Sequence, residues 1–250
     1  MTNKPVKIKN LYGFSGTKVY LYEDIEKYFV RKFDTNKRNI PRILSLKNIL
    51  NLPKIYNIQK NYYDMEYIHG LDLKNYLYIN NEEKLIKFII DSLNKLSQKS
   101  LPKDYTSIYE KYLDKINFKN HFKFTKKDLI KKLPKVLPQT QYHGDFTLDN
   151  LIFSNNKFYF IDPLESEFDS YVFDYSKLRQ DLDIYWLVRD NNQHLKQKLD
   201  YIKIILSRKF KLMNNKYLLI LMLIRVFRYV RNNSFEFNFL KKEINRIWQL

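Results

Sequence analysis

The pattern of apolar and polar residues predicts strands in the first part of the chain. Lys18–Glu23 and Lys27–Phe33 are rich in β-branched and aromatic residues, and the turn Glu23–Glu26 joins them as a hairpin. Alternation places Val30 and Lys32 on one face of the second strand. A cation on a core-facing position is costly unless it is paired. Lys32 therefore faces either an anion, such as a nucleotide phosphate, or the water at a sheet edge.

A second hairpin is predicted in the middle of the chain. Leu151–Phe153 and the strongly apolar run Phe158–Ile161 flank the polar turn Ser154–Lys157. A hairpin brings its two ends together. Asn150 and Asp162, which flank this one, are therefore expected to lie close enough to share one cation.

Helical periodicity marks later segments. The basic stretch Lys123–Lys135 carries four apolar residues at helical spacing, which predicts a helix with a solvated basic face. The apolar run Leu218–Ile224 is far shorter than the roughly 20 residues of a membrane span, and Arg225, Arg228 and Arg231 follow it. The first residues lack the apolar core of a secretory signal. We therefore expect a soluble, cytoplasmic protein.

Composition narrows the class of protein further. Hydrophobic residues make up 44% and charged residues 29%, as in folded domains, and the absence of Cys excludes disulfides and thiolate metal sites. The net charge of +18 raises the question of a nucleic-acid partner. Lys is enriched here together with Asn, Ile and Tyr, which share A/T-rich codons, so genomic base bias explains the charge without such a partner. Nucleic-acid binding is therefore not the favoured function.

Glycine is scarce, with four residues where about 17 would be ordinary for this length. The four are Gly13, Gly16, Gly70 and Gly144. The loop Gly13, Phe14, Ser15 and Gly16 directly precedes the first predicted hairpin, so its backbone N–H groups could cradle phosphates. Plain hairpins also carry this spacing, so the loop alone does not identify a nucleotide site.

The residues that indicate a chemistry lie around the second hairpin. His143, Asp145 and Asn150 form an H-x-D-x-x-x-x-N pattern, and Asp162 ends the following strand. Phosphoryl transfer requires a carboxylate that accepts the proton of the attacking hydroxyl, a role that suits Asp145. It also requires hard oxygen ligands for Mg²⁺, a role that suits Asn150 and Asp162. His143 is expected to brace the loop.

This set of motifs resembles the aminoglycoside phosphotransferase and choline kinase superfamily, from about Leu11 to Tyr175. The resemblance implies an α+β, protein-kinase-like bilobal fold. Residues 1–67 would form a small antiparallel β N-lobe that binds the nucleotide, and residues 68–250 a larger, mainly helical C-lobe that carries catalysis and substrate binding.

The resemblance also assigns a nucleotide site for ATP, with GTP as the alternative donor. It identifies Gly13–Gly16 with the nucleotide loop and Lys32 with the strand lysine that contacts the phosphates. Val30 would touch adenine, and the backbone of Glu66, Tyr67 and Ile68 would meet the adenine edge as the hinge. Gly70 would open the larger lobe, with Leu71–Leu77 starting its first helix.

Three further features concern the surroundings of this site. In the superfamily a helix glutamate pairs with the strand lysine, but Arg38–Leu50 contains no acidic residue. Either Lys32 pairs with another carboxylate, such as Asp162, or ATP binds more weakly. Asp174 matches an aspartate that begins a core helix and is expected to be structural. For Arg225, Arg228 and Arg231 three roles are open: they pair with Asp174, bind substrate or face water.

The functional expectation is a kinase that phosphorylates a hydroxyl of a small metabolite. Aminoglycoside pockets are typically acidic, whereas this chain is basic, which favours a neutral or anionic acceptor such as a sugar in surface-polysaccharide assembly. An amino alcohol is the other small metabolite considered. The alternative is a catalytically silent kinase-like module that binds a protein or nucleic acid. Asp145, Asn150 and Asp162 favour the enzyme, and the missing helix glutamate weakly favours the silent module.

Overall fold

The computed structural model describes residues 5–11, 18–25, 27–33, 39–118, 121–189 and 192–250. The strands are β1 (Val6–Leu11), β2 (Val19–Asp24), β3 (Lys27–Phe33), β4 (Ile55–Ile58), β5 (Tyr62–Glu66), β6 (Leu71–Asp72), β7 (Leu101–Asp104), β8 (Val136–Gln139), β9 (Leu151–Ser154) and β10 (Lys157–Phe160). The α-helices are α1 (Asn39–Leu46), α2 (Leu73–Ile79), α3 (Glu83–Leu96), α4 (Thr106–Leu113), α5 (Lys126–Lys132), α6 (Tyr171–Asp183), α7 (Gln193–Lys209), α8 (Lys216–Phe227) and α9 (Phe235–Gln249). Three 3₁₀ turns are η1 (Leu148–Asn150), η2 (Trp186–Val188) and η3 (Lys211–Met213).

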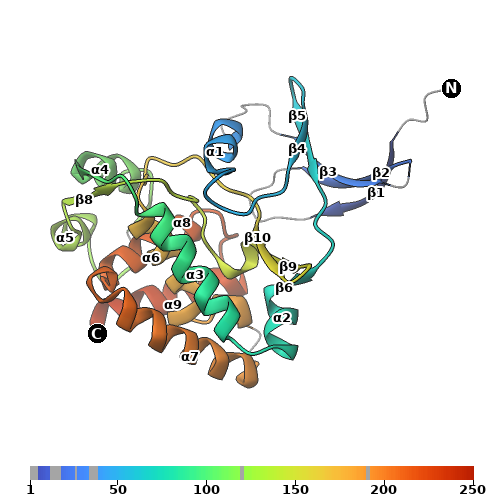
Figure 1. The fold of residues 1–250 in the computed structure, drawn as a ribbon. Coiled ribbons are helices and arrows are strands. Elements are labelled where there is room, and N and C mark those ends of the chain that lie inside the picture. The colour runs from blue at the N-terminus through green and yellow to red at the C-terminus, as the bar shows by residue number, and fades with distance from the viewer. Residues whose placement is uncertain (1–4, 12–17, 26, 34–38, 119–120, 190–191) are drawn as a thin grey trace.

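The N-terminal part is a five-stranded antiparallel sheet in the order β1-β2-β3-β5-β4. The predicted hairpin is present as β2 and β3, in which Val19 lies opposite Lys32. Helix α1 packs on this sheet through Ile40 and Ile43, which contact the buried Tyr63 of β5. Figure 1 shows the sheet at one end of the molecule, with α1 between it and the helices.

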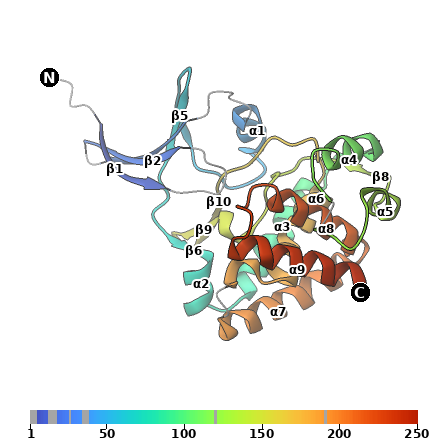
Figure 2. The same cartoon turned by 180° about the vertical axis from the view of Figure 1, so that it is seen from behind.

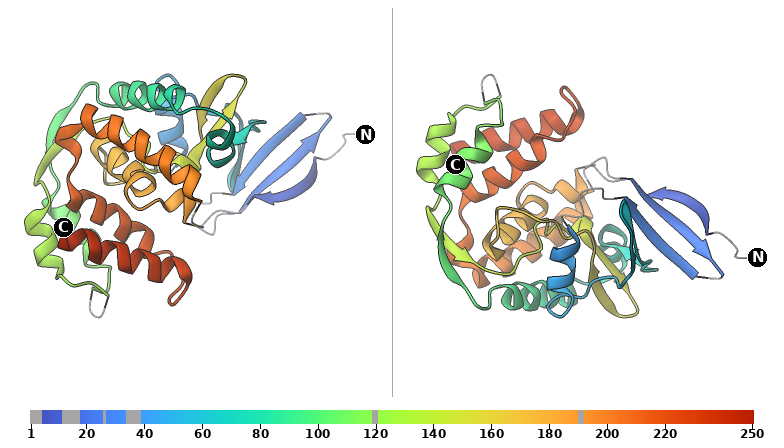
Figure 3. Two further views of the ribbon diagram at one scale, coloured as in Figure 1. Left: turned by 90° about the horizontal axis from the view of Figure 1, so that it is seen from below. Right: turned by 90° about the horizontal axis from the view of Figure 1, so that it is seen from above.

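The C-terminal part is mainly helical and holds most of the core. The run Leu218–Ile224 of α8 is completely buried, and α8 contacts both α6 and α9. Helices α3 and α9 lie on opposite faces of this part (Figures 1 and 2). The strands β1 and β2 of the N-terminal sheet extend away from the helices (Figure 3). Among the described residues no helix is long and apolar enough to cross a membrane. The molecule therefore has the expected bilobal α+β architecture.

The second predicted hairpin is present as β9 and β10, joined by Asn155 and Asn156. Both asparagines have positive φ angles, of 48° and 63°, which asparagine tolerates better than most residues. Strand β6 extends this hairpin into a three-stranded sheet, because Leu71 and Asp72 pair with β9. The helix expected from Leu71 thus begins two residues later, and Asp72 caps it by accepting from the amide of Asn75 at 2.8 Å.

Two other helix predictions are adjusted by the structure. The basic stretch Lys123–Lys135 does contain a helix, but α5 covers only Lys126–Lys132, since the Thr125 capping box starts it and the chain turns extended at Leu133. Its lysines are largely exposed, as expected of a solvated basic face. At the C-terminal end of α8, Arg225 lies within the helix, whereas Arg228 and Arg231 lie beyond its end and are exposed.

Candidate active site

The loop that carries the expected catalytic residues leaves β8 and ends in η1. It makes a sharp turn at Gly144, whose φ is +86°. A Cβ added at this position would lie 2.1 Å from the carbonyl oxygen of Leu164, so the turn excludes every side chain. The amide of Leu164 donates to the carbonyl of His143 at 2.9 Å. The loop is thereby joined to the segment that follows β10.

Asp145 and Asn150 are brought together within this loop. The side-chain amide of Asn150 donates to Asp145 Oδ2 at 2.9 Å and to the Asp145 carbonyl at 2.8 Å. The same carbonyl accepts from the amide of Thr147 at 2.9 Å. The five-residue spacing of the motif therefore forms a closed turn, and Asn150 Nδ2 orients the Asp145 carboxylate.

His143 braces the loop from inside the core, as expected from the sequence. It is completely buried, and its Nδ1 accepts from the amide of Asp145 at 3.3 Å. Burial lowers the pKa of His143 to about 4, against the opposing influence of the nearby Asp145 and Asp162 carboxylates. The imidazole is therefore neutral at physiological pH, which suits a structural role.

Helix α6 lies alongside the loop and binds its backbone. Asp174 in the first turn of α6 accepts from the amides of His143 at 2.5 Å and Gly144 at 2.8 Å. Burial raises the pKa of Asp174 to about 7, although these two N–H groups and Arg225 favour the ionised form. In the last turn of the helix, Asp181 accepts from the amide of Leu148 at 2.7 Å. The structural role expected for Asp174 agrees with these contacts.

Two residues beside Asp145 were missed by the sequence analysis or left without a role. Lys177 of α6 is buried, and its Nζ lies 3.2 Å from Asp145 Oδ1. Arg225 of α8 donates to the Gly144 carbonyl at 3.3 Å. Burial raises the pKa of Asp145, but Lys177 and Arg225 outweigh it and hold the pKa below its usual value. The spacing of Asp174, Lys177 and Asp181 on one face of a core helix was the available signal.

The strand lysine reaches the end of the second hairpin. Lys32 is 4% exposed, and its ammonium forms an ion pair with Asp162. The amide of Ile161 donates to the Asn150 carbonyl at 2.9 Å, which places Asp162 next to the end of η1, as the hairpin predicts. Asp162 has a φ of 57°, in the left-handed region. Lys32 therefore pairs with a carboxylate other than a helix glutamate, which was one of the alternatives left open by the sequence.

The neighbouring Arg31 points to the other face of the sheet, as alternation requires. Its guanidinium binds Asp64 of β5 in a bidentate pair, with Nε–Oδ1 at 2.6 Å and Nη2–Oδ2 at 2.8 Å. Val30 and Lys32 are both buried on the opposite face. The face of β3 that carries Lys32 is therefore the one turned toward the second hairpin.

The segment expected to form the hinge follows β5. Glu66 ends β5, where its amide donates to the Lys54 carbonyl at 2.8 Å. The ring of Tyr67 packs edge-on against that of His69 at a centroid distance of 4.5 Å, and Ile68 is buried. The other expected nucleotide residues, Gly13, Phe14, Ser15 and Gly16, lie outside the described residues. The segment after β5 therefore connects the N-terminal sheet to β6, and its contact with a nucleotide stays a prediction.

Helix α1, which lacks a glutamate for Lys32, is bonded to the C-terminal part instead. Arg42 is buried, binds the side chain of Gln141 and stacks on the ring of Tyr142 at 4.2 Å. The side chain of Asn39 accepts from the amide of Glu165 at 2.9 Å. These contacts join α1 to both flanks of the catalytic loop rather than to the strand lysine.

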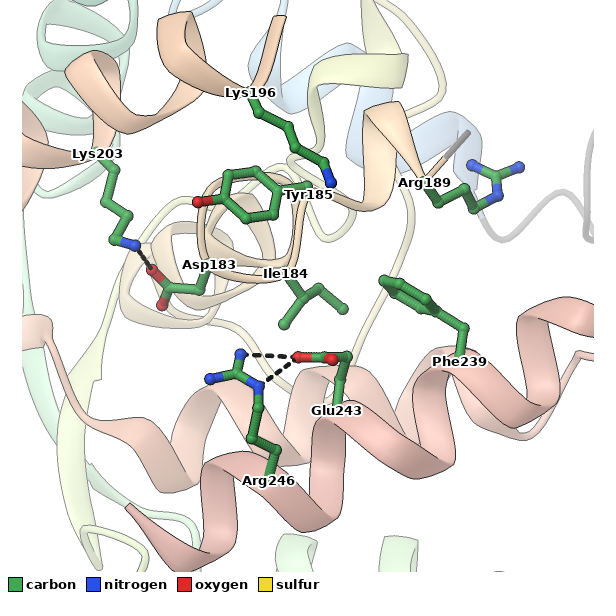
Figure 4. A pocket seen from close by; sticks show the side chains of 9 residues that line it. All are labelled: Asp183, Ile184, Tyr185, Arg189, Lys196, Lys203, Phe239, Glu243 and Arg246. Carbon is green, nitrogen blue, oxygen red and sulfur yellow. Dashed lines mark hydrogen bonds and ion pairs between the residues drawn. The ribbon is translucent and has the colours of Figure 1, made fainter. Parts of the chain in front are cut away.

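A cavity of about 470 Å³ lies between the end of α6, α7 and α9 (Figure 4). Its lining contains charges of both signs, many of them in ion pairs with each other. Arg246 binds Glu243 at 2.7 Å, and Lys203 lies 3.7 Å from Asp183. Asp183 is also bound by Arg179 at 2.7 Å. Asp183 falls on the side of α6 away from Asp174, Lys177 and Asp181, so this cavity is separate from the catalytic loop.

Comparison with known proteins identifies the fold. No profile of a protein family and no curated protein sequence matches the chain. Solved structures do match. An aminoglycoside phosphotransferase, APH(4)-Ia, in a ternary complex with ADP and hygromycin B superposes with a TM-score of 0.69 at 8% identity, covering 98% of this chain and 93% of that one.

Two further structures match at similar coverage. An ethanolamine kinase of Plasmodium vivax has a TM-score of 0.56 at 14% identity, covering 97% of this chain and 82% of that one. A candidate fructosamine-3-kinase of Haemophilus somnus has a TM-score of 0.57 at 14% identity, covering 97% and 92%. The chain therefore has the same bilobal fold as these solved structures, which confirms the fold expected from the sequence motifs.

Proposed function

We propose that this chain is an ATP-dependent kinase that phosphorylates a hydroxyl group of a small molecule. The observation that carries the proposal is the setting of Asp145. Its carboxylate is partly exposed, is held at Oδ1 by Lys177 and at Oδ2 by Asn150, and has a lowered pKa. An ionised carboxylate oriented in this way can align a hydroxyl and accept its proton as the oxygen attacks phosphorus.

The nucleotide would bind between the N-lobe, residues 1–67, and the C-lobe, residues 68–250. Lys32 would contact the phosphates, and Val30 and the backbone of Glu66–Ile68 would contact adenine. The burial of Lys32 and its pairing across the lobes with Asp162 support this assignment, since a buried ammonium requires an anion. The loop Gly13–Gly16 would cover the phosphates with its N–H groups.

Asn150 and Asp162 fit a Mg²⁺ ion that is bound together with the nucleotide. The Nδ2 group of Asn150 donates to Asp145, which leaves Oδ1 as the atom that would bind the cation, and Asp162 adds a carboxylate. Among the described residues no group of three or more His, Cys, Asp or Glu could hold a metal alone. A site with two protein oxygens, completed by phosphates and water, is what Mg²⁺ uses in kinases. When bound, Mg²⁺ would neutralise charge on the phosphates.

The acceptor would reach Asp145 between the catalytic loop and the C-lobe helices, in a cytoplasmic enzyme. Lys177 and Arg225 both place positive charge beside Asp145. The chain as a whole also carries a net charge of +18, which disfavours a polycationic acceptor such as an aminoglycoside. A neutral or anionic metabolite fits better, such as a sugar used in surface-polysaccharide assembly.

Thermal melting with Mg-ATP tests the nucleotide assignment directly. A ligand that binds only the folded state stabilises it by mass action, so the melting temperature is expected to rise by several degrees at saturation. Mg-GTP is the second arm, because a hinge that uses backbone contacts does not by itself exclude guanine. The absence of a shift with either nucleotide at millimolar concentration would contradict the kinase assignment.

The acceptor is then identified by ADP release with a library of sugars, amino alcohols and aminoglycosides. Turnover of a neutral or anionic compound supports the proposed acceptor class. Turnover of aminoglycosides alone would overturn that part of the proposal. Nucleotide binding without turnover of any acceptor, water included, would favour the silent binding module.

A further inference from the structure

Helix α6 contacts the catalytic loop through three charged residues at positions i, i+3 and i+7, which share one face of the helix. All three are buried, with exposed fractions of 2%, 7% and 0% in chain order. Their partners follow the same order along the loop. The contacts are Asp174 with the amides of His143 and Gly144, Lys177 with the carboxylate of Asp145, and Asp181 with the amide of Leu148.

The middle contact differs in kind from the other two. Asp174 and Asp181 bind backbone amides and so determine the shape of the loop. Lys177 instead binds the side chain that is the proposed base. A buried ammonium costs free energy unless a carboxylate compensates it, so Lys177 and Asp145 depend on each other. Packing alone does not explain a lysine at this position, because an apolar residue would fill the same space at lower cost.

We propose that Lys177 is a positioning residue for the reaction, which holds Oδ1 of Asp145 so that the carboxylate meets the acceptor hydroxyl in one fixed orientation. This inference rests on the proposed kinase function. The carboxylate is held at both oxygens by donors from separate elements, Lys177 of α6 and Asn150 of η1. Two such donors prevent rotation of the carboxylate and leave specific lone pairs for the hydroxyl proton.

The charge of Lys177 has a second consequence. Its ammonium lies 3.2 Å from Oδ1 and so compensates the negative charge of the Asp145 carboxylate at this position. In the reaction the acceptor oxygen forms a bond to the γ-phosphorus, the bond from that phosphorus to ADP breaks, and the hydroxyl proton passes to Asp145. Lys177 keeps its own protons throughout.

The first test needs no activity. In the nucleotide-free protein, urea denaturation measures the free energy of unfolding of Lys177→Met, of Asp145→Asn and of the double variant. Each single change leaves a buried charged group without its partner, so the double variant is expected to lose less stability than the sum of the two single losses. Lys177→Arg retains the charge and should stay near the wild type. Full additivity of the two stability losses would overturn the proposal.

The second test measures hydrolysis of Mg-ATP, with water as a slow acceptor. Lys177→Met is expected to lower kcat about 10-fold or more with little change in the KM for ATP. Lys177→Arg should recover part of the rate. Because Lys177 acts through Asp145, adding Lys177→Met to Asp145→Asn should cost almost nothing further. Full additivity of the two losses would contradict the positioning role.

Lys203 supplies the matched control. It is also an ion-paired lysine, 3.7 Å from Asp183, but it lies on α7 at the separate cavity (Figure 4). Lys203→Met should show no coupling to Asp145→Asn in the free energy of unfolding and should leave the hydrolysis rate unchanged. If the wild type hydrolyses no ATP although Lys177→Met and Asp145→Asn are coupled in stability, the proposed function fails. The coupling of Lys177 to Asp145 would then stand without it.

Discussion

Two lysine–aspartate pairs lie on either side of the proposed reaction, and they differ in what holds them. Lys32 and Asp162 join the N-terminal sheet to the end of the second hairpin, 130 residues apart in the chain, and the Asp162 side chain is 37% exposed. Lys177 and Asp145 lie within the C-terminal part, and Asp145 is also bound by Asn150. The first pair has one contact between two lobes, whereas the second belongs to a network along α6.

The same two residue types can therefore form a pair that changes partners or a pair that stays fixed, depending on exposure and on the number of other contacts. An exposed carboxylate with one partner can exchange that partner for a metal ion when a nucleotide arrives, and its lysine can then move to a phosphate. A carboxylate held by two donors inside a packed helix–loop contact keeps its orientation throughout. We therefore propose that the Lys32 pair exchanges its partners when nucleotide binds and that the Lys177 pair persists, and we call them the exchangeable pair and the permanent pair. The predictions that follow separate the two.

The largest effect is expected from Asp145→Asn, which removes the base from the permanent pair. The amide keeps the shape of the side chain but cannot accept the proton, so kcat should fall by about 10²-fold or more with little change in the KM for ATP. Steady-state kinetics with the identified acceptor, and with water as acceptor, measure this. Undiminished turnover would mean that the loop is scaffolding and that the silent-module alternative applies.

A complementary effect is expected from Asp162→Ala, which breaks the exchangeable pair. Metal-dependent nucleotide binding should be lost, because the variant lacks one of the two proposed Mg²⁺ ligands. Asp145→Ala is the matched carboxylate deletion and should bind Mg-ATP nearly as well as the wild type. Calorimetric titration with and without Mg²⁺ distinguishes the two variants. Equal loss of binding in both would show that the roles of the two carboxylates are misassigned.

The smallest effect concerns stability and pH, and it tests the network around the permanent pair. Burial, reinforced by Asp149, raises the pKa of Asp181 to about 8, and burial raises that of Asp174 to about 7. Between the unfolded pKa and these values the folded state binds more protons than the unfolded state, so the free energy of unfolding falls as pH rises. His143, with a folded pKa of about 4, opposes this trend only below about pH 6.5.

Urea denaturation should therefore show a decline in the free energy of unfolding between about pH 6.5 and 8, with little further change above the folded pKa of Asp181. Asp181→Asn cannot ionise and should flatten the decline above about pH 7, where Asp181 is the main group still titrating. Asp183→Asn, which changes a carboxylate on the opposite face of α6, is the control and should leave the slope unchanged. A wild-type stability that rises over this range would contradict the assignment of buried, proton-binding carboxyls.

Local patterns accounted for much of the site because its elements are close in sequence. The turn from Asp145 to Asn150 closes within five residues, and the hairpin that leads to Asp162 is only slightly longer. The faces of β3 followed from strand alternation, which placed Lys32 and Arg31 on opposite sides. The two-residue strand β6 was missed, since its pairing with β9 lies about 80 residues away and carries no local signal.

By itself, the sequence determined the candidate catalytic motif, the two hairpins and the short apolar run Leu218–Ile224, because each depends on neighbouring residues. Only the tertiary structure decided which partners meet across the chain. Lys32 meets Asp162, Arg42 meets Gln141 and Lys177 meets Asp145 because packed elements bring them together. Those contacts depend on the register of α6 against the loop and of α1 against the C-terminal part. That register depends on how the whole core packs, so it cannot be predicted from any short segment of the sequence.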